Sequence, residues 1–208
     1  MHLADHRVVT DSDLHLLQNR GFVCVNDAIQ ESSLQQIARQ VEIQRPFAKR
    51  STRTGFSTYG NGRGLCGPKQ QGVTQAPPSL RELWNAPEMH RLIALVLGRE
   101  AKGTKVAVLH YAVGDFVDLH TDVAPCEVTV LTSLVPFESH IEVFPSAPRD
   151  GTALVGWASN PSGGVRVPVR WRGLTVFFGS KIPHRRPPAK QPIAVASMCY
   201  EAADAKRY

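Results

Sequence analysis

The sequence predicts an α+β protein in which a helical first half is followed by an antiparallel β-sandwich or barrel. Helical periodicity and capping signals are confined to about the first hundred residues. From residue 104 to residue 201 the chain instead carries eight short apolar runs separated by Gly, Pro, Asn and Asp. Strands joined by turns rather than by helices pair antiparallel. We therefore expect residues 1–103 to be a helical lead-in that packs outside a sheet formed by residues 104–201.

The chain opens with a capped helix. Thr10 precedes two aspartates and a leucine-rich run, which is typical of a helix N-terminus, and Gly21 marks the end of the helix. Residues 22–25 form an apolar run that we expect to be a short strand. A second helix is expected to begin at Ser32 or Ser33, because the apolar residues that follow recur at a spacing near 3.6.

Residues 45–78 differ in composition from the segments on either side. They are rich in Gly, Ser, Thr and basic side chains, which predicts one long basic loop. A loop of this length in a compact domain is usually functional, so we expect it to flank or cover an active site, with an ordinary solvated loop as the alternative. Two further helices are predicted at 79–84 and at 87–97, the second ending at Gly98.

The second half is expected to contain eight strands. Each is short, rich in β-branched or aromatic residues and bounded by turn residues. The runs are 106–111, 116–120, 128–135, 141–144, 152–157, 165–169, 174–178 and 193–200. This number of antiparallel strands is typical of a sandwich or barrel.

Composition limits the class of protein. A chain of 208 residues with 42% hydrophobic and 20% charged residues is expected to form one globular domain. No apolar run reaches the length of a membrane span and the N-terminus lacks a leader pattern, so we expect a cytoplasmic protein without a membrane partner. The 4 cysteines show no Cys-x-x-Cys spacing, so we expect no zinc site or disulfide framework, and we expect Cys24 and Cys199 to be buried free thiols.

The positive charge is concentrated in two stretches. The formal net charge is +6, and no acidic residue occurs at positions 43–81 or 151–200. A groove lined by one sign of charge raises the local concentration of oppositely charged ligands. The sequence therefore predicts a small anionic partner, and the basic residues Arg50 and Arg53 are the candidates to bind it.

Three residues have the chemistry of a metal site. His120 and Asp122 end the strand-like run 116–120, and side chains at i and i+2 of a strand point to one face. His184 lies 62 positions beyond Asp122, just after another strand-like run. Two histidines and one carboxylate with the other coordination positions open form the facial triad of non-heme iron(II) oxygenases.

At these residues the chain resembles the iron(II)/2-oxoglutarate-dependent dioxygenases, and among them the prolyl 4-hydroxylase-like group. The resemblance rests on Tyr111, Gly114, His120, Asp122 and His184 in their order and spacing, and it covers residues 105–200. It implies a double-stranded β-helix, the jelly-roll or cupin-like barrel. It also implies that the triad binds Fe(II) and is catalytic, with 2-oxoglutarate and O2 as cosubstrates, succinate and CO2 as co-products, and hydroxylation or a related oxidation as the reaction.

The resemblance also implies residues that bind 2-oxoglutarate. Tyr111 stands where the family places a tyrosine that hydrogen-bonds the distal carboxylate, although a plain core aromatic is the alternative. Thr132 is a second candidate for the same carboxylate.

The cationic anchor for that carboxylate departs from the family pattern. Family members place Lys or Arg nine or ten residues after the second histidine, where this chain has Ile193 and Ala194. Lys190 is the nearest basic residue on the expected side, and Arg186 or Arg172 could substitute for it. A buried dicarboxylate needs a charge-assisted partner, so one of these three should face the metal.

Three functions remain open. The leading one is a dioxygenase that oxidises an unactivated carbon of a small anionic metabolite or amino-acid derivative, with peptidyl-proline modification as the family-based alternative. A cupin-like metal enzyme that does not use 2-oxoglutarate is the second. A nucleic-acid binder is the third and least favoured, because aromatic residues are not interleaved with the basic ones. The sequence makes no prediction of the oligomeric state.

Overall fold

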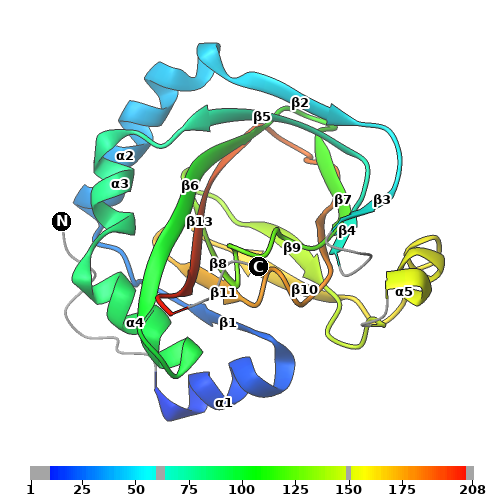
Figure 1. The fold of residues 1–208 in the computed structure, drawn as a ribbon. Coiled ribbons are helices and arrows are strands. Elements are labelled where there is room, and N and C mark those ends of the chain that lie inside the picture. Colours follow the sequence, from blue (N-terminus) through cyan, green and yellow to red (C-terminus); the bar gives the residue numbers. More distant parts are fainter. Residues whose placement is uncertain (1–9, 60–63, 149–150, 205–208) are drawn as a thin grey trace.

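A rolled antiparallel sheet dominates the computed structural model, which describes residues 10–59, 64–148 and 151–204 (Figure 1). The helices are α1 (Asp11–Arg20), α2 (Glu31–Gln44), α3 (Pro78–Trp84), α4 (Pro87–Leu97) and α5 (Gly151–Ala158), with a 3-10 turn at Arg45–Phe47. The strands of the first half are β1 (Phe22–Val25), β2 (Lys49–Arg53), β3 (Ser57–Tyr59), β4 (Gly64–Cys66) and β5 (Lys69–Gln75). Those of the second half are β6 (Ala101–Tyr111), β7 (Phe116–His120), β8 (Val128–Ser133), β9 (Ser139–Val143), β10 (Val165–Val169), β11 (Leu174–Phe177), β12 (His184–Arg186) and β13 (Ile193–Ala202).

Strand β5 connects the two layers of the barrel. The strand order is β1-β11-β8-β13-β6-β5-β7-β12-β9-β10, and β2 also pairs with β5. One part of β5 pairs with β6, where Val73 lies opposite Leu109, and its first residues pair with β7, where Lys69 lies opposite Val117. The sheet therefore continues around a bend instead of ending at an edge, and it encloses the interior seen end-on in Figure 1.

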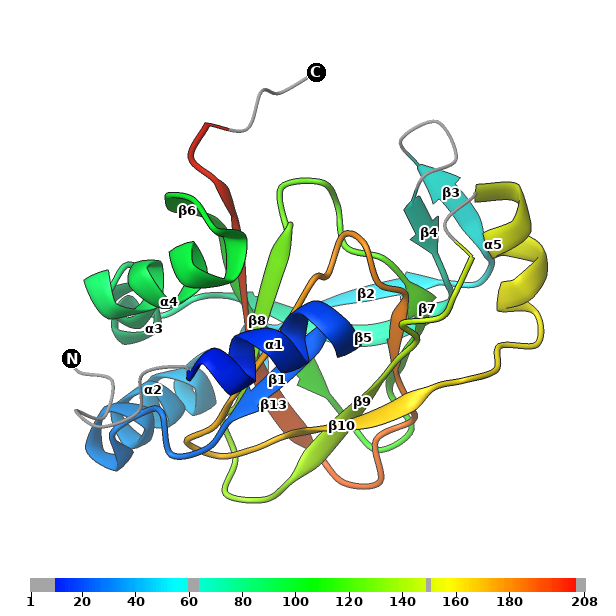
Figure 2. The same ribbon diagram turned by 90° about the horizontal axis from the view of Figure 1, so that it is seen from below.

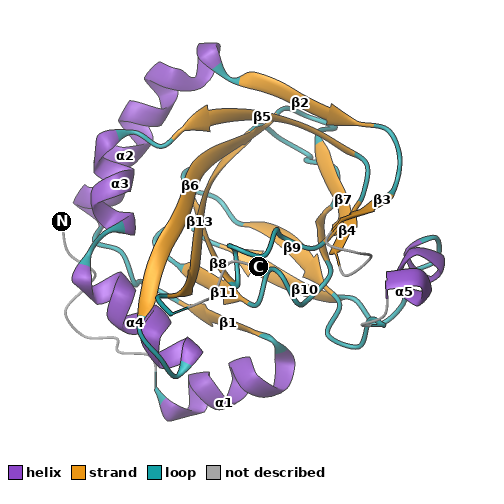
Figure 3. Ribbon diagram, viewed as in Figure 1, coloured by secondary structure: helices purple, strands orange, loops and turns teal. Residues whose placement is uncertain are grey.

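Three helices cover one outer face of the barrel. Figures 1 and 3 show α2, α3 and α4 along the outside of β6 and β13, and Figure 2 shows α1 beside β1. The helices bury Ile37, Leu80 and Ile93 completely against the sheet. An amphipathic helix gains most of its stability from such packing. The apolar stripes predicted for these helices are the faces that pack against the sheet.

Alternation along β8 separates this outer core from the barrel interior. Val128 and Val130 belong to the cluster under the helices, whereas Leu131 belongs to the cluster inside the barrel. Thr129 and Leu131 line the internal cavity. The side-chain period of two therefore lets one strand support both layers.

The predicted fold class is confirmed. The antiparallel strands form a nearly closed jelly-roll barrel, the double-stranded β-helix, with helices outside. Helix α1 begins at the predicted cap, where the Thr10 hydroxyl accepts from the Asp13 amide, and it ends at Gly21 in the left-handed conformation. Helix α2 begins at Glu31, so neither Ser32 nor Ser33 caps it, and Ser33 is buried inside the helix.

Two predicted segments have a different structure. Residues 45–78 are not one long loop, because β2 and β5 add to the barrel and β3 and β4 form a separate two-stranded sheet. Residues 152–157 lie in helix α5 instead of a strand. Its Leu154 and Ala158, four residues apart, are buried beside Phe144. The periodicity of a short apolar run does not separate a helix from a strand. The packing against Phe144 therefore decided that this segment is helical.

A disulfide bond joins the loop after β7 to the last strand. Cys126 and Cys199 are 73 positions apart and both are buried, so the expectation of a free thiol at Cys199 was wrong. Cys24 is free as expected, but it is half-buried instead of buried. No local spacing signals such a pair. Disulfides are more usual in oxidising compartments, so this bond does not support the cytoplasmic prediction. None of the helices in the described residues is long and apolar enough to span a membrane.

Replacing both Cys126 and Cys199 with Ser should lower the free energy of unfolding by about 2–4 kcal/mol, because the unfolded chain regains the entropy of an open loop. Urea unfolding followed by circular dichroism would measure the loss. Dithiothreitol should destabilise the wild type to the same extent and leave the double variant unchanged. Equal midpoints for the oxidised wild type and the double variant would contradict a stabilising cross-link.

Candidate metal centre

The two histidines meet through strand pairing. His184, the first residue of β12, lies directly opposite His120, the last residue of β7, in the antiparallel register. Their ring centroids are 4.2 Å apart. Directly opposed residues of two antiparallel strands project to the same side, so both rings face one point inside the barrel.

Asp122 completes the cluster from the turn after β7. Its Oδ1 lies 3.8 Å from Nε2 of His120 and its Oδ2 lies 3.8 Å from Nε2 of His184. All three candidate ligand atoms lie within 4.8 Å of one another. Two donor atoms that each lie about 2.1 Å from one ion are at most about 4.2 Å apart, so the cluster has nearly the size of a single-ion site.

Backbone carbonyls orient both imidazoles. Nδ1 of His120 lies 2.9 Å from the Asp118 oxygen, and Nδ1 of His184 lies 3.0 Å from the Ile182 oxygen. A carbonyl oxygen can only accept, so each Nδ1 carries the proton and each Nε2 presents a lone pair to the centre. Burial, and next the neighbouring His184, lower the pKa of His120 to about 4, which keeps the ring neutral and able to bind a metal near pH 7.

Two residues hold the carboxylate of Asp122. The Thr129 hydroxyl donates to Oδ2 at 2.5 Å, and the Asp122 amide donates to the Gly179 oxygen at 2.8 Å. A Cβ on Gly179 would lie only 2.2 Å from Oδ2 of Asp122 and 2.3 Å from Oγ1 of Thr129. Glycine is therefore required at 179 for the carboxylate to reach its position.

The hairpin formed by β3 and β4 supports the same turn. The Leu65 amide donates to Oγ1 of Thr121 at 3.0 Å, and the Thr121 amide donates to the Leu65 oxygen at 2.9 Å. The Tyr59 hydroxyl hydrogen-bonds to the backbone oxygens of Thr121 and Asp122. This part of the predicted loop thus flanks the site and positions the turn that carries Asp122.

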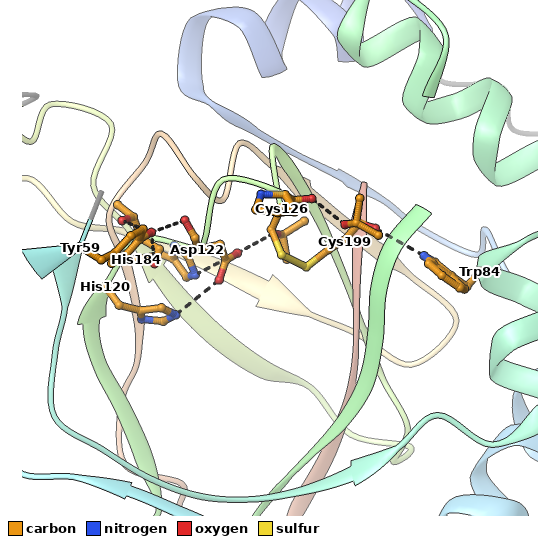
Figure 4. The surroundings of a disulfide bond; sticks show 11 residues. Tyr59, Trp84, His120, Asp122, Cys126, His184 and Cys199 are labelled. Atoms are coloured by element: carbon orange, nitrogen blue, oxygen red, sulfur yellow. Dashed lines mark hydrogen bonds and ion pairs between the residues drawn. A yellow bond between two sulfur atoms is a disulfide. The ribbon is translucent and has the colours of Figure 1, made fainter. Parts of the chain in front are cut away.

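The cluster lines a cavity of about 370 Å³ inside the barrel. Its apolar wall includes Val117, Leu131, Ile141, Phe177 and Val195. The disulfide lines another part of the wall, and Figure 4 shows it beside Asp122 on one side and Trp84 on the other. The Trp84 indole donates to the Cys199 oxygen at 3.4 Å, which connects this wall to the outer helices.

Arg186 is a buried cation that faces the interior. It lies two residues after His184, lines the cavity and is only 5% exposed. Its Nη1 donates to Ser139 Oγ at 3.2 Å, whereas its buried Nη2 has no hydrogen-bond partner among the described residues. Its guanidinium carbon lies 5.0 Å from the centre of the Tyr111 ring, which also lines the cavity.

Two of the expected 2-oxoglutarate residues do not reach the cavity. Lys190 is exposed in the turn before β13 and does not line the cavity. Thr132 is fully buried, but its hydroxyl donates to the Arg170 oxygen at 3.5 Å on the other face of β8 from Leu131. Tyr111 and Arg186 are the candidates that the cavity retains.

The two arginines that we expected to bind the substrate have different environments. Arg50 forms a bidentate pair with the buried Asp115, with contacts of 2.6 and 2.9 Å, and does not line the cavity. This pairing lowers the pKa of Asp115 and raises that of Arg50. Arg50 therefore has a structural contact, whereas Arg53 lines the cavity.

Sequence reasoning missed Thr129, Gly179 and Tyr59. Thr129 reads as a β-strand residue, Gly179 as a turn after a strand, and Tyr59 as part of a polar loop. Only the position of Gly179 directly after a strand gives a weak signal of a close backbone approach.

The fold and this cluster combine a double-stranded β-helix with two histidines and one carboxylate that face one point in its interior. No family model matches the sequence, and no curated protein matches it. Similar solved structures include the α-ketoglutarate-dependent epimerase SnoN from nogalamycin biosynthesis, with a TM-score of 0.70 at 15% identity over 93% of this chain and 83% of that chain. The carbocyclase SnoK of the same biosynthesis has a TM-score of 0.70 at 15% identity over 97% and 87%. A Pseudomonas putida prolyl-4-hydroxylase has a TM-score of 0.62 at 12% identity over 92% of this chain and 97% of that chain. These likenesses establish the shared fold.

Replacing Gly179 with Ala should weaken metal binding by about 10- to 100-fold, because the added methyl group displaces the Asp122 carboxylate and its Thr129 partner. Calorimetric titration with Mn(II) or anaerobic Fe(II) would measure the affinity. Gly55→Ala is the matched control, since a Cβ at Gly55 meets nothing within 4 Å. Unchanged affinity in a folded Gly179→Ala protein would show that the cluster is not the metal site.

Proposed function

We propose that the chain is one non-heme Fe(II)/2-oxoglutarate-dependent oxygenase domain that oxidises an unactivated carbon of a small anionic substrate. The observation that carries the proposal is the cluster of His120, Asp122 and His184 in a cavity that also contains the unpartnered Arg186 nitrogen. Bound Fe(II), with 2-oxoglutarate and O2, would supply the oxidising chemistry and release succinate and CO2.

The donor set fits iron(II). Two neutral imidazoles and one carboxylate are the facial triad, which leaves the remaining positions of an octahedral ion open for ligands. Thr129 hydrogen-bonds to the carboxylate and the carbonyls of Asp118 and Ile182 hold the rings, so the three donors are oriented before the metal arrives.

Arg186 fits the distal carboxylate of 2-oxoglutarate. Its buried Nη2 lacks an acceptor, and leaving a charged donor unsatisfied is costly, so an anion at this point stabilises the site. Burial raises the pKa of Tyr111, which keeps its hydroxyl protonated and able to donate to the same carboxylate. A guanidinium on β12 thereby replaces the cation that the prolyl hydroxylase-like pattern places on the last strand.

The rest of the cavity excludes water and admits a small substrate. The apolar wall around Leu131 and Phe177 limits solvent access to the reacting centre. A volume of about 370 Å³ is in the range of small-ligand pockets. This size favours a metabolite or amino-acid derivative over an extended peptide. Peptidyl proline remains the second candidate because solved prolyl hydroxylases share the fold.

Anaerobic addition of Fe(II) and 2-oxoglutarate should produce a weak visible charge-transfer band, because the cosubstrate would bind the metal through its keto and carboxylate oxygens. Absorption spectroscopy of the full chain would record it. A metal enzyme that does not use 2-oxoglutarate would bind Fe(II) without giving this band, which would exclude the proposed reaction class.

Replacing Arg186 with Gln should raise the KM for 2-oxoglutarate by about tenfold or more, since a charge-assisted hydrogen bond contributes about 1.5–3 kcal/mol. Succinate formation at varied 2-oxoglutarate concentration would measure the change. Lys190→Gln removes the same charge from a nearby exposed position and should leave the KM unaltered. Equal effects of the two substitutions would remove Arg186 from the proposed subsite.

A further inference from the structure

One wall of the cavity is polar and carries positive charge. Arg53 of β2 lies directly opposite Lys69 of β5, and Ser51 lies directly opposite Gln71 in the same register. All four residues line the cavity, as does Lys105 of β6. Because β2 and β5 alternate with period two, these side chains share the inner face of the barrel. Lys69 also pairs with Val117 of β7, so the wall adjoins the strand that ends at the metal cluster.

The three cations of this wall lack acidic partners; Arg53 and Lys69 are half-buried, and Lys105 is exposed. In the described part of the chain, no ion pair involves Arg53, Lys69 or Lys105. Among the residues that the structure describes, the metal-ligand candidate Asp122 is the only acidic one that lines the cavity. Arg50, on the opposite face of β2, is fully paired with Asp115. On β2, the paired arginine therefore lies outside the cavity, and the arginine without an acidic partner lines it.

A cationic wall without a bound anion is electrostatically unfavourable. Like charges directly opposite each other on paired strands are destabilising. Burial first, then the charges of Arg53 and Lys105, lower the pKa of Lys69. The side-chain oxygen of Gln71 is buried and has no hydrogen-bond partner among the described residues. The repulsion among the cations is relieved when an anion enters the cavity, whereas the Gln71 oxygen needs a hydrogen-bond donor, such as a hydroxyl group of the ligand.

The loaded oxygenase site would leave these cations for the substrate. This step rests on the proposed function, in which the charges of Fe(II), Asp122, 2-oxoglutarate and Arg186 cancel. No group already in the cavity then compensates the positive charge of the wall. A neutral substrate such as a peptidyl proline would not compensate it either.

We propose that Arg53, Lys69 and Lys105, with the Gln71 amide, form a subsite for a compact dianionic group of the substrate, either a phosphate monoester or a pair of neighbouring carboxylates. The subsite orients the substrate by its charged end and leaves the carbon to be oxidised near the metal cluster. Lysine and arginine donors suit such a group because charge-assisted hydrogen bonds to phosphate or carboxylate are the strong ones.

Calorimetric titration of the full metal-free chain with inorganic pyrophosphate and, separately, with malonate tests the subsite without iron or 2-oxoglutarate. At least one probe should bind, and the tighter one identifies phosphate or dicarboxylate chemistry. Lys69→Gln and Arg53→Gln should each weaken that binding by about tenfold or more. The affinity should also fall as salt is added.

Two control variants separate this subsite from other cations. Lys49→Gln removes an exposed charge from the same strand outside the cavity, and Arg186→Gln removes the proposed 2-oxoglutarate anchor. Lys49→Gln should bind the probe within twofold of the wild type, and Arg186→Gln should keep the binding that Lys69→Gln and Arg53→Gln weaken. Loss of binding in Arg186→Gln alone, or an equal loss in Lys49→Gln, would overturn the proposal, as would failure of both probes to bind the wild type.

Thermal unfolding distinguishes ligand binding from a structural role. Lys69→Gln relieves repulsion from Arg53, so its melting temperature should be equal to or above that of the wild type. A lower melting temperature with unchanged probe affinity would make Lys69 a structural residue and overturn the subsite. If the oxygenase proposal is wrong, the charge-transfer band will be absent from the anaerobic spectrum. The titration of the metal-free chain with pyrophosphate or malonate does not depend on that outcome.

Discussion

The antiparallel pairing of β7 with β12 is the constraint on which the site depends. It places His184 opposite His120 and turns two imidazoles that are far apart in the sequence toward one point. Neither strand could shift by one residue without turning its histidine to the outer face, because side chains alternate between the two faces of a strand. After a shift of register within β12, Arg186 lies opposite Val117 and also lines the cavity, so one strand of three residues supplies both a metal-ligand candidate and the cation that we propose for 2-oxoglutarate.

Strand β5 gives the barrel its second functional wall. It pairs with β6 in one layer and with β7 in the other, and β2 pairs along its first residues. A strand that bends between two layers brings the cations of the first half of the chain beside the metal cluster of the second half. The cavity therefore has a cationic wall next to the cluster, an apolar wall and the buried guanidinium of Arg186, and this arrangement is the basis for the anionic substrate that we propose.

The turn that carries Asp122 is held from several directions. Thr129 and Gly179 fit around the carboxylate, and the Tyr59 hydroxyl and Leu65 backbone hold the main chain. The disulfide between Cys126 and Cys199 ties the following loop to β13. A carboxylate oriented in advance by hydrogen bonds and packing loses little entropy when it binds a metal, which is the usual purpose of such a surrounding shell.

The sequence by itself determined the fold class and the helices that cover the barrel, because these depend on local periodicity and capping, and it indicated His120, Asp122 and His184 as candidate metal ligands through their residue types, order and spacing. It also indicated that positive charge gathers in two stretches. It did not determine which charges face inward: Arg50 turned to Asp115, Lys190 to solvent and Thr132 to the outer face, whereas Arg53 and Arg186 entered the cavity. Strand register, the disulfide and the helix at α5 were decided only by the tertiary structure, since each depends on contacts between residues distant in the chain that no local pattern records.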